Sequence, residues 1–547
     1  MDSPDQVIIE GDGAPTWHVR LIGVLAVALL VAATLFVALN DREDRDQPTG
    51  EATPSASPTP KPSPTPPPGL EVLDSPGAAA RAGAETVLAV ANRDLAESQL
   101  GGGWPIEGER PVYVVNVTVR GERDFLLADQ VIALRIDEPT DRLDLRFLPA
   151  AAALGTEPPF VAGSVDGEPA TITMDPVGAV LRIDLGAGRE AGEALLVRLS
   201  YRYTLARAST LGGDGPVGYG LLSRDESVTV LSHWLPLLTF DASPLQARGD
   251  LGAFPPAIWS VEVVHPGVLV TGGVEDDCRV PVDNCTKASG VGLRDLGMLV
   301  LDEADVLAGR AGQHEVRVIH GPAVPAADVR AVLAETIAAV ELFNELFGPL
   351  AWPQTDVVGT PLSRGAAGME YPGMFILRDD LWRSHDGAFG TYVIAHEVAH
   401  QWFHGLVGNS SLADPVVDEA IAQYLSVVFY AEQYGEQAAT DLADSMIQRW
   451  QDGLASGMRD DPPAQALAAF ESDRAYGAIV YGRAPFAFIE AERVLGREVV
   501  IGFLAELVRR HALDAITVTD VVTLAGEIDE GLMGSINEWW IWPDPSL

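Results

Sequence analysis

The sequence predicts a multidomain α+β protein in which an all-β domain precedes a mainly helical domain and a single transmembrane helix lies near the N-terminus. Three observations lead to this prediction. An apolar run of nineteen residues extends from Leu21 to Leu39. Short apolar runs of period two follow between Pro111 and about Val300, and helical periodicity takes over near residue 310. A chain of 547 residues is long enough to bury two or three separate cores.

The apolar run is the expected membrane anchor. At a rise of 1.5 Å per residue, residues 21–39 are long enough to cross a hydrocarbon core of roughly 30 Å. Residues 1–20 then form a short cytoplasmic tail. A cleaved signal peptide is the alternative, but no small-x-small cleavage pattern follows the run, since Phe36 stands two residues before Ala38. The sequence therefore favours an uncleaved single-pass anchor.

Residues 40–70 are expected to form a stalk, because the tract from Thr53 to Pro68 is rich in Pro, Ser and Thr and favours an extended chain. The basic residues on either side of the anchor do not fix its orientation. Cys278 and Cys285, the only cysteines, are close enough in sequence for a small disulfide loop in an oxidising compartment, although two reduced thiols are the alternative. We therefore expect a cell-membrane protein whose folded domains lie outside the cell.

Residues 71–305 are predicted to form the β domain, led by an alanine-rich helix over residues 78–96. Beyond that helix, apolar side chains alternate with polar ones over several short runs, and Pro, Gly and Asp separate the runs, which is typical of half-buried strands. The expected strands are Val112–Val119, Val131–Ile136, Leu143–Leu148, Leu181–Leu185, Leu195–Tyr203 and Trp259–Val264.

Residues 306–547 are predicted to form the mainly helical domain. A strand-like segment, Val316–Ile319, precedes an amphipathic helix that should end before Gly348. The apolar positions that define this helix are Val329, Val332, Leu333, Ile337, Val340 and Phe343. Helical patterns then hold from Phe389 to the end of the sequence.

The charge balance excludes one class of partner. The chain has 36 basic and 78 acidic residues, which gives a formal net charge of −42. Nucleic acid is therefore not expected as a partner, since a phosphate backbone would be repelled.

One motif in the helical domain predicts a metal site. His396 and His400 lie one turn apart on a helix, so both imidazoles can reach one cation, with Glu397 beside them. Glu419 follows His400 after eighteen residues and is placed to add a carboxylate from a second helix. A His-His-Glu set leaves one coordination position open for water, as in catalytic zinc sites. The predicted zinc ligands are therefore His396, His400 and Glu419.

Three further motifs accompany the histidine pair. The segment Gly365–Gly373 precedes it, and Asp418–Glu419 and Val480–Ala484 follow it. In order and spacing, these motifs and His396–Phe403 resemble the aminopeptidase N family of gluzincin metallopeptidases. The resemblance spans roughly residues 105–547. It implies a saddle-like β sandwich followed by a thermolysin-like catalytic domain.

The resemblance also implies a zinc-dependent aminopeptidase with one Zn²⁺ per chain. Zinc would lower the pKa of a bound water toward about 7 and so provide a nucleophile at neutral pH. Glu397 would act as the general base, and Tyr481 would stabilise the tetrahedral oxyanion. Glu370, with Gly368 and Met369 beside it in the same motif, would bind the free α-ammonium group of peptide substrates.

The chain departs from the family pattern at the amine site. Many members carry a second anchoring carboxylate in the N-terminal domain, whereas the comparable stretch here, Leu231–Pro236, has none. Amine capture is therefore expected to rest on Glu370 alone. The predicted function is removal of N-terminal residues from peptides outside the cytoplasm. A zinc endopeptidase, a hydrolase of another small substrate and a non-catalytic tethered binding module are the alternatives.

Overall fold

The computed structural model describes residues 83–92, 104, 108–121, 123–211, 215–246, 248–252, 254–278, 284–360, 362 and 366–541. They belong to one compact unit, Thr65–Leu547. The predicted tail, transmembrane helix and stalk, residues 1–70, lie outside the described residues. Within the described part of the chain, no helix combines the length and the apolar character needed to cross a bilayer.

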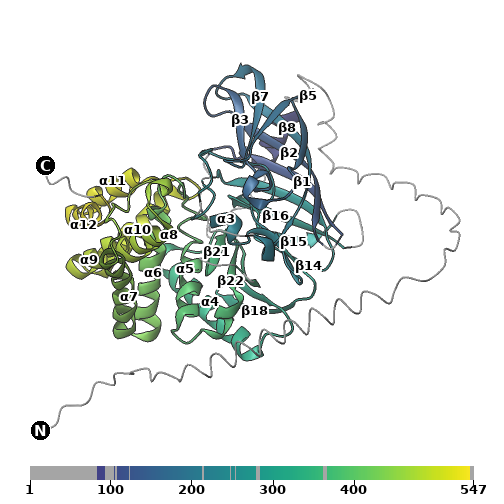
Figure 1. Cartoon of the computed structure of the whole chain (residues 1–547). Coiled ribbons are helices and arrows are strands. Elements are labelled where there is room, and N and C mark those ends of the chain that lie inside the picture. Colours follow the sequence, from purple (N-terminus) through teal and green to yellow (C-terminus); the bar gives the residue numbers. More distant parts are fainter. Residues whose placement is uncertain are drawn as a thin grey trace, which may run out of the picture. The chain divides into compact units, whose positions relative to one another are not determined.

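The first half of the described chain is built from strands that form three sheets (Figure 1). The largest has the order β15-β16-β13-β1-β2-β8-β4-β5, and the others are β14-β17-β11-β10-β9 and β12-β3-β7-β6. The strands are β1 (Val112–Arg120), β2 (Phe125–Arg135), β3 (Thr140–Arg146), β4 (Phe160–Val165), β5 (Glu168–Pro169), β6 (Thr171–Asp175), β7 (Val180–Arg189), β8 (Ala194–Thr204), β9 (Ala206–Arg207), β10 (Leu222–Arg224), β11 (Val228–Leu231), β12 (Leu237–Leu238), β13 (Ala257–Val264), β14 (Val268–Thr271), β15 (Val274–Asp277), β16 (Cys285–Leu293) and β17 (Met298–Leu301).

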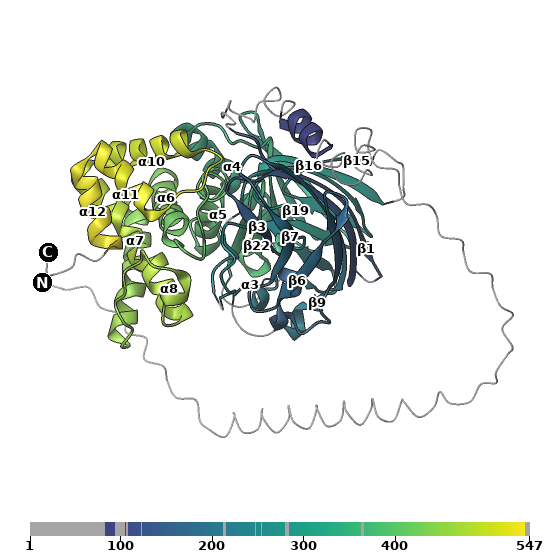
Figure 2. The same ribbon diagram turned by 90° about the horizontal axis from the view of Figure 1, so that it is seen from above.

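Alternating burial along these strands produces the core of this half. In β1, Tyr113, Val115 and Val117 are buried while the residues between them are partly exposed, as the period of two predicts. The Tyr113 ring stacks on Trp259 of the paired strand β13, with 4.3 Å between ring centroids. The expected leading helix is described over residues 83–92 and packs through Leu88 against this sheet (Figure 2).

The cysteine pair lies at the edge of the largest sheet. Cys278 follows β15, Cys285 begins β16, and the two form a disulfide with 5.8 Å between their Cα atoms. The disulfide therefore joins two strands that are already paired through their backbones.

The second half combines a five-stranded sheet with helices, which Figure 1 shows grouped together. The sheet order is β18-β19-β20-β22-β21. Its strands are β18 (Asp305–Ala311), β19 (His314–His320), β20 (Gln354–Thr360), β21 (Gly368–Tyr371) and β22 (Met374–Arg378). The helices are α4 (Ala326–Phe347), α5 (Phe389–Ala399), α6 (Val416–Tyr434), α7 (Glu436–Ala455), α8 (Asp473–Ala478), a π-helical turn (Ile479–Arg483), α9 (Phe486–Leu495), α10 (Arg497–His511), α11 (Val518–Ile528) and α12 (Glu530–Trp540).

The prediction of a β-sheet part followed by a helical part is confirmed, and α4 covers the predicted amphipathic helix. The sequence did not predict β20, β21 and β22. Strands β20 and β22 pair in parallel and are buried almost throughout, so they lack the alternation that marks a half-exposed strand. Strand β21 has only four residues.

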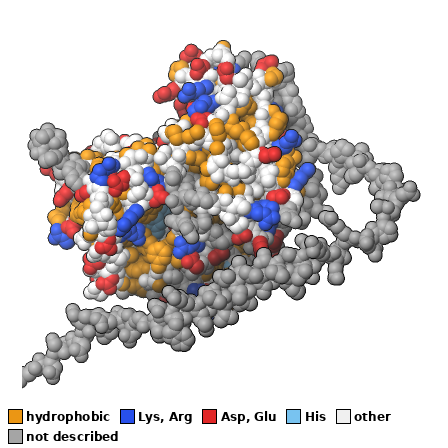
Figure 3. All heavy atoms as spheres, in the orientation of Figure 1, with side chains coloured by type: hydrophobic (Ala, Val, Ile, Leu, Met, Phe, Trp, Pro, Cys, Tyr) orange, Lys and Arg blue, Asp and Glu red, His pale blue; other side chains and the backbone are white. Residues whose placement is uncertain are grey.

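Buried hydrogen bonds join the two halves. Arg294, which follows β16, donates to the carbonyl oxygens of Gly405 at 3.0 Å, Leu406 at 3.2 Å and Asp514 at 2.6 Å. The Tyr371 hydroxyl on β21 donates to Ser232 Oγ at 2.7 Å. The edge strand that carries Glu370 is therefore fixed against the β half. Figure 3 shows acidic and basic side chains interspersed on one face of the molecule.

Candidate metal centre and active site

Helix α5 presents the two predicted histidine ligands. His396 lies in its last turn and His400 follows directly, so the two imidazoles lie on one side of the helix. Their Nε2 atoms are 3.1 Å apart. His400 Nδ1 donates to the carbonyl oxygen of Phe403 at 3.0 Å, which leaves the lone pair of its Nε2 atom directed at His396.

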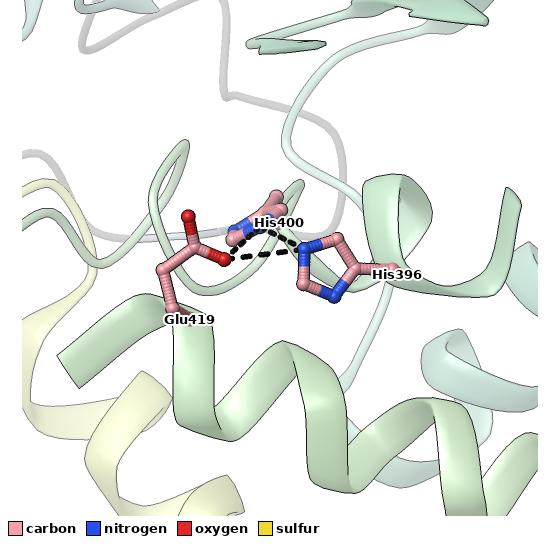
Figure 4. A group of neighbouring side chains, drawn as sticks. All are labelled: His396, His400 and Glu419. Atoms are coloured by element: carbon pink, nitrogen blue, oxygen red, sulfur yellow. Dashed lines mark hydrogen bonds and ion pairs between the residues drawn. The ribbon is translucent and has the colours of Figure 1, made fainter. Parts of the chain in front are cut away.

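Helix α6 supplies the third ligand. Glu419 lies in its first turn, where the positive end of the helix dipole favours a carboxylate. Its Oε2 atom is 3.2 Å from His396 Nε2 and 3.6 Å from His400 Nε2 (Figure 4). Burial opposes ionisation, but hydrogen bonds from the two imidazoles hold the pKa of Glu419 well below its usual value.

The three ligand atoms fit a zinc ion. Atoms held at roughly 2.1 Å around a tetrahedral ion would lie about 3.4 Å apart. The separations of 3.1, 3.2 and 3.6 Å bracket that value. When both imidazoles are neutral and direct their Nε2 lone pairs inward, the three atoms are all acceptors and repel one another, and a cation removes that repulsion. His396, His400 and Glu419 therefore form a site suited to one zinc ion.

Glu397 lies beside the ligands and is buried, with one carboxylate oxygen that has no hydrogen-bond partner among the described residues. Burial and the nearby charge of Glu370 raise its pKa well above the usual value, whereas a bound dication would act in the opposite direction. Gly368 on β21 packs directly against this carboxylate, and a Cβ atom at position 368 would overlap it. Gly368 therefore fixes the position of Glu397.

Tyr481 reaches the same point from the π-helical turn. Its hydroxyl donates to Glu419 Oε1, and its ring packs edge-on against Tyr476, with 5.6 Å between ring centroids. Burial and the Glu419 charge raise the pKa of Tyr481 well above its usual value, so the phenol stays protonated. A π-helical turn inserts an extra residue into a helix and is often found at functional sites.

The structure places a second carboxylate beside Glu370. Oxygen atoms of Glu370 and Asp250 and a ring nitrogen of His404 all lie within 4.8 Å of one another. Burial raises the pKa of Glu370 to about 7. The expectation that Glu370 would be the only carboxylate at this position is therefore wrong, because Asp250 from the β half lies next to it.

His233 holds Asp250 in this position. Burial opposes its protonation, but Asp295 at 3.0 Å and Asp250 at 3.3 Å raise the pKa of His233 to about 10. The imidazolium donates to Asp250, and this hydrogen bond offsets burial and keeps the pKa of Asp250 below its usual value. The segment around His233 thus supports a carboxylate seventeen residues further along the chain.

The predicted zinc ligands, the catalytic residues and the Glu370 carboxylate surround a cavity of about 290 Å³. Every predicted catalytic, substrate-binding and metal-binding residue except His400 lines it, and His400 is buried behind His396. The predicted lining residues are Gly368, Met369, Glu370, His396, Glu397, Glu419 and Tyr481. Asp250 also lines the cavity, and no sequence motif pointed to it.

Comparison with known proteins agrees with this geometry. Residues 332–540 match the Peptidase family M1 domain. Within the second half, these residues therefore correspond to a family M1 peptidase domain. This family is the one that the sequence motifs indicated, and its zinc metallopeptidase members imply one catalytic zinc ion in the site described above.

Individual relatives match only part of the chain. Leukotriene A-4 hydrolase of Xenopus laevis is 26% identical over 188 residues, 34% of this chain and 30% of its own length. Aminopeptidase M1 of Arabidopsis thaliana is 27% identical over 185 residues, 32% of this chain and 20% of its own length. The chain thus spans less than a third of the length of either relative.

A solved structure matches over a longer span. An M1 zinc metallopeptidase mutant from Deinococcus radiodurans, in complex with a Tyr-Ser-Ala substrate, covers 79% of this chain and 94% of its own, with a TM-score of 0.60 and 20% identity. At this identity the match shows the shared fold.

The first prediction concerns the metal. The purified protein should contain about one zinc ion per chain. Loss of a residue that hydrogen-bonds to a metal ligand typically weakens metal binding about 10- to 100-fold, and His400→Gln or Glu419→Gln, which removes a ligand itself, should weaken it by more. Metal content measured by mass spectrometry checks this. His404→Gln is the control and should retain zinc. Loss of zinc from the control, with retention in Glu419→Gln, would move the metal to the neighbouring Asp250, Glu370 and His404 cluster.

The second prediction concerns Gly368. Gly368→Ala should displace the Glu397 carboxylate and lower kcat by about 100-fold, since a displacement of roughly 1 Å in a catalytic group has this effect. Zinc content and thermal stability should change little. Gly502→Ala is the control, because a Cβ atom there meets no neighbour within 4 Å. Equal activity of the two variants would show that Gly368 does not position Glu397.

Proposed function

We propose that this protein is a zinc-dependent aminopeptidase that removes N-terminal residues from peptides outside the cytoplasm. The observation that carries the proposal is the placement of Glu370 and Asp250 beside the predicted zinc ligands. Two partly buried carboxylates at this spacing can both accept hydrogen bonds from one ammonium group. Binding of the substrate amine there would place the first peptide bond next to Glu397.

The residues of the site divide the chemistry among them. Zinc held by His396, His400 and Glu419 would activate water and polarise the substrate carbonyl. Glu397 takes the proton of the attacking water and passes it to the leaving amine nitrogen. The protonated Tyr481 donates a hydrogen bond to the carbonyl oxygen as negative charge develops on it.

The ammonium group of a bound substrate would also favour the charged state of Glu370. Burial raises the pKa of this carboxyl group to about 7, so a positive charge beside it stabilises the carboxylate. Asp250 is kept ionised by His233. The Deinococcus metallopeptidase that shares this fold binds a peptide substrate with three residues, which supports a peptide as the ligand of this cavity.

We also propose that residues 21–39 anchor the protein in the cell membrane, with residues 40–70 as a stalk. The nineteen-residue apolar run and the Pro-rich tract support this proposal. The disulfide between Cys278 and Cys285 is consistent with an oxidising compartment.

The third prediction tests the catalytic groups. Glu397→Gln should keep the metal and lower kcat by about 10²- to 10⁴-fold, the usual effect of losing a general base. Tyr481→Phe should lower kcat much more than it raises KM, because the oxyanion forms only on the reaction path. Steady-state kinetics on an aminoacyl p-nitroanilide checks both, with Tyr434→Phe as the control. Undiminished turnover in zinc-loaded Glu397→Gln would exclude Glu397 as the base.

The fourth prediction tests the amine site. N-acetylated peptides should be poorer substrates than free peptides by about ten- to a hundredfold in kcat/KM, because a charge-assisted hydrogen bond is lost. Glu370→Gln should remove most of this preference and Asp250→Asn should reduce it. Product analysis by mass spectrometry reports which bond is cut. Equal cleavage of free and acetylated peptides at internal bonds would favour a zinc endopeptidase instead.

The fifth prediction tests the topology. Protease added to intact cells should release an active fragment by cutting within residues 53–68, since extended Pro-rich segments are accessible to proteases. Immunoblotting of the medium and activity of the released fragment measure this. If cutting requires cell lysis, the folded domains do not lie outside the cell.

A further inference from the structure

Five aromatic rings follow one another along α5 and the turn after it. Successive ring centroids are 5.5 Å apart from Phe389 to Tyr392, 6.1 Å to His396, 4.6 Å to His400 and 6.1 Å to His404. Phe389, Tyr392 and His396 line the cavity, and the row continues through His400 to His404, so it runs past the metal-binding pair toward Glu370.

Charged residues of opposite sign lie beside the two ends of the row. At one end, His404 lies 3.9 Å from Glu370, next to Asp250. At the other end, Phe389 and Tyr392 line the cavity together with Arg449 of α7. A peptide whose amine binds at Glu370 therefore extends past the metal-binding pair toward Arg449.

Among the described residues that line this cavity, Arg449 is the arginine available to a ligand. Arg248 also lines it, but Arg248 donates to Asp473 at 2.7 Å and to the carbonyl oxygens of Phe470 and Leu467. Arg449 is exposed, and no hydrogen bond or ion pair joins it to another residue in the part of the chain that the structure describes. Burial raises the pKa of the Tyr392 hydroxyl, and the positive charge of Arg449 acts against that shift.

A second hollow continues beyond Arg449. It has a volume of about 340 Å³ and shares Phe389, Tyr392 and Arg449 with the first cavity. Asp441 also lines this hollow, and it accepts a hydrogen bond from Gln437 at 2.8 Å. Arg449 therefore stands at the junction of the two cavities, where the downstream part of a bound peptide would pass.

We propose that Arg449 binds a carboxylate of the substrate on the downstream side of the cleaved bond. This inference rests on the proposed aminopeptidase function. A peptide advances roughly 3.3–3.6 Å per residue, so the 6.1 Å from His396 to Tyr392 corresponds to about two residues. The C-terminal carboxylate of a tripeptide or an acidic side chain in a longer peptide would reach the guanidinium.

Binding of a substrate carboxylate by Arg449 depends on local hydrogen bonding and not on the overall charge of the protein. The chain carries a net charge of −42, which repels anionic peptides in general. A guanidinium binds a carboxylate through two parallel hydrogen bonds. Because Arg449 is exposed, its effect should be modest, about three- to tenfold in kcat/KM.

The test compares Ala-Ala-Ala as the free acid, Ala-Ala-Ala amide and Ala-Ala-Asp amide as substrates of the full-length zinc enzyme. The unmodified protein should cleave the free acid about three- to tenfold better than the amide. Arg449→Gln should bring this ratio to about one, and Arg449→Lys should restore part of it. Arg493→Gln on α9, whose arginine is paired with Glu490 on the surface, is the control and should keep the original ratio.

Comparison of the three peptide substrates identifies the source of the carboxylate. Recovery of activity with Ala-Ala-Asp amide shows that an acidic side chain can also supply the carboxylate, and its absence restricts the site to the C-terminus. The inference is overturned if the unmodified protein shows no preference for the free acid, or if Arg449→Gln keeps the preference. Leucine p-nitroanilide has no carboxylate, so its hydrolysis by the unmodified protein tests the aminopeptidase function separately.

Discussion

The rest of the active site depends on the approach of α6 to α5. This approach brings Nε2 of His396, Nε2 of His400 and Oε2 of Glu419 within 3.6 Å of one another. Three acceptors at this spacing are unfavourable by themselves and favourable around a cation. The Glu397 carboxylate comes from α5 itself, and the Tyr481 hydroxyl, which comes from the π-helical turn, is held by its hydrogen bond to Glu419 on α6.

Local sequence spacing was sufficient to predict the part of the site that lies on single helices. His396 and His400 are one turn apart on α5, so helical geometry alone places their side chains together. The alternation in β1 and β13 likewise predicted their buried faces. The positions of Glu370 and Tyr481 came from the family resemblance, because no local periodicity joins them to the histidine pair.

Contacts between distant segments could not be predicted in this way. Asp250 lies in an irregular segment and is brought to Glu370 by His233, which itself has a positive φ of 45°. The packing of Gly368 against Glu397 depends on how β21 lies across α5, and β21 is fixed by Gln401, which donates to the Tyr371 carbonyl oxygen at 3.0 Å. Neither relation has a sequence signature, since each depends on the tertiary fold.

The hydrogen bonds of Arg294 have a mechanical consequence. The metal-binding atoms all come from the helical half. The proposed amine site instead combines Glu370 from that half with Asp250 from the β half. Arg294 joins the halves through carbonyl oxygens near the metal-binding turn, Gly405 and Leu406. These hydrogen bonds oppose a rocking of one half against the other, which would alter the spacing of the two carboxylates while the metal ligands keep theirs. Substrate affinity and metal affinity can thus respond separately to temperature or to mutation.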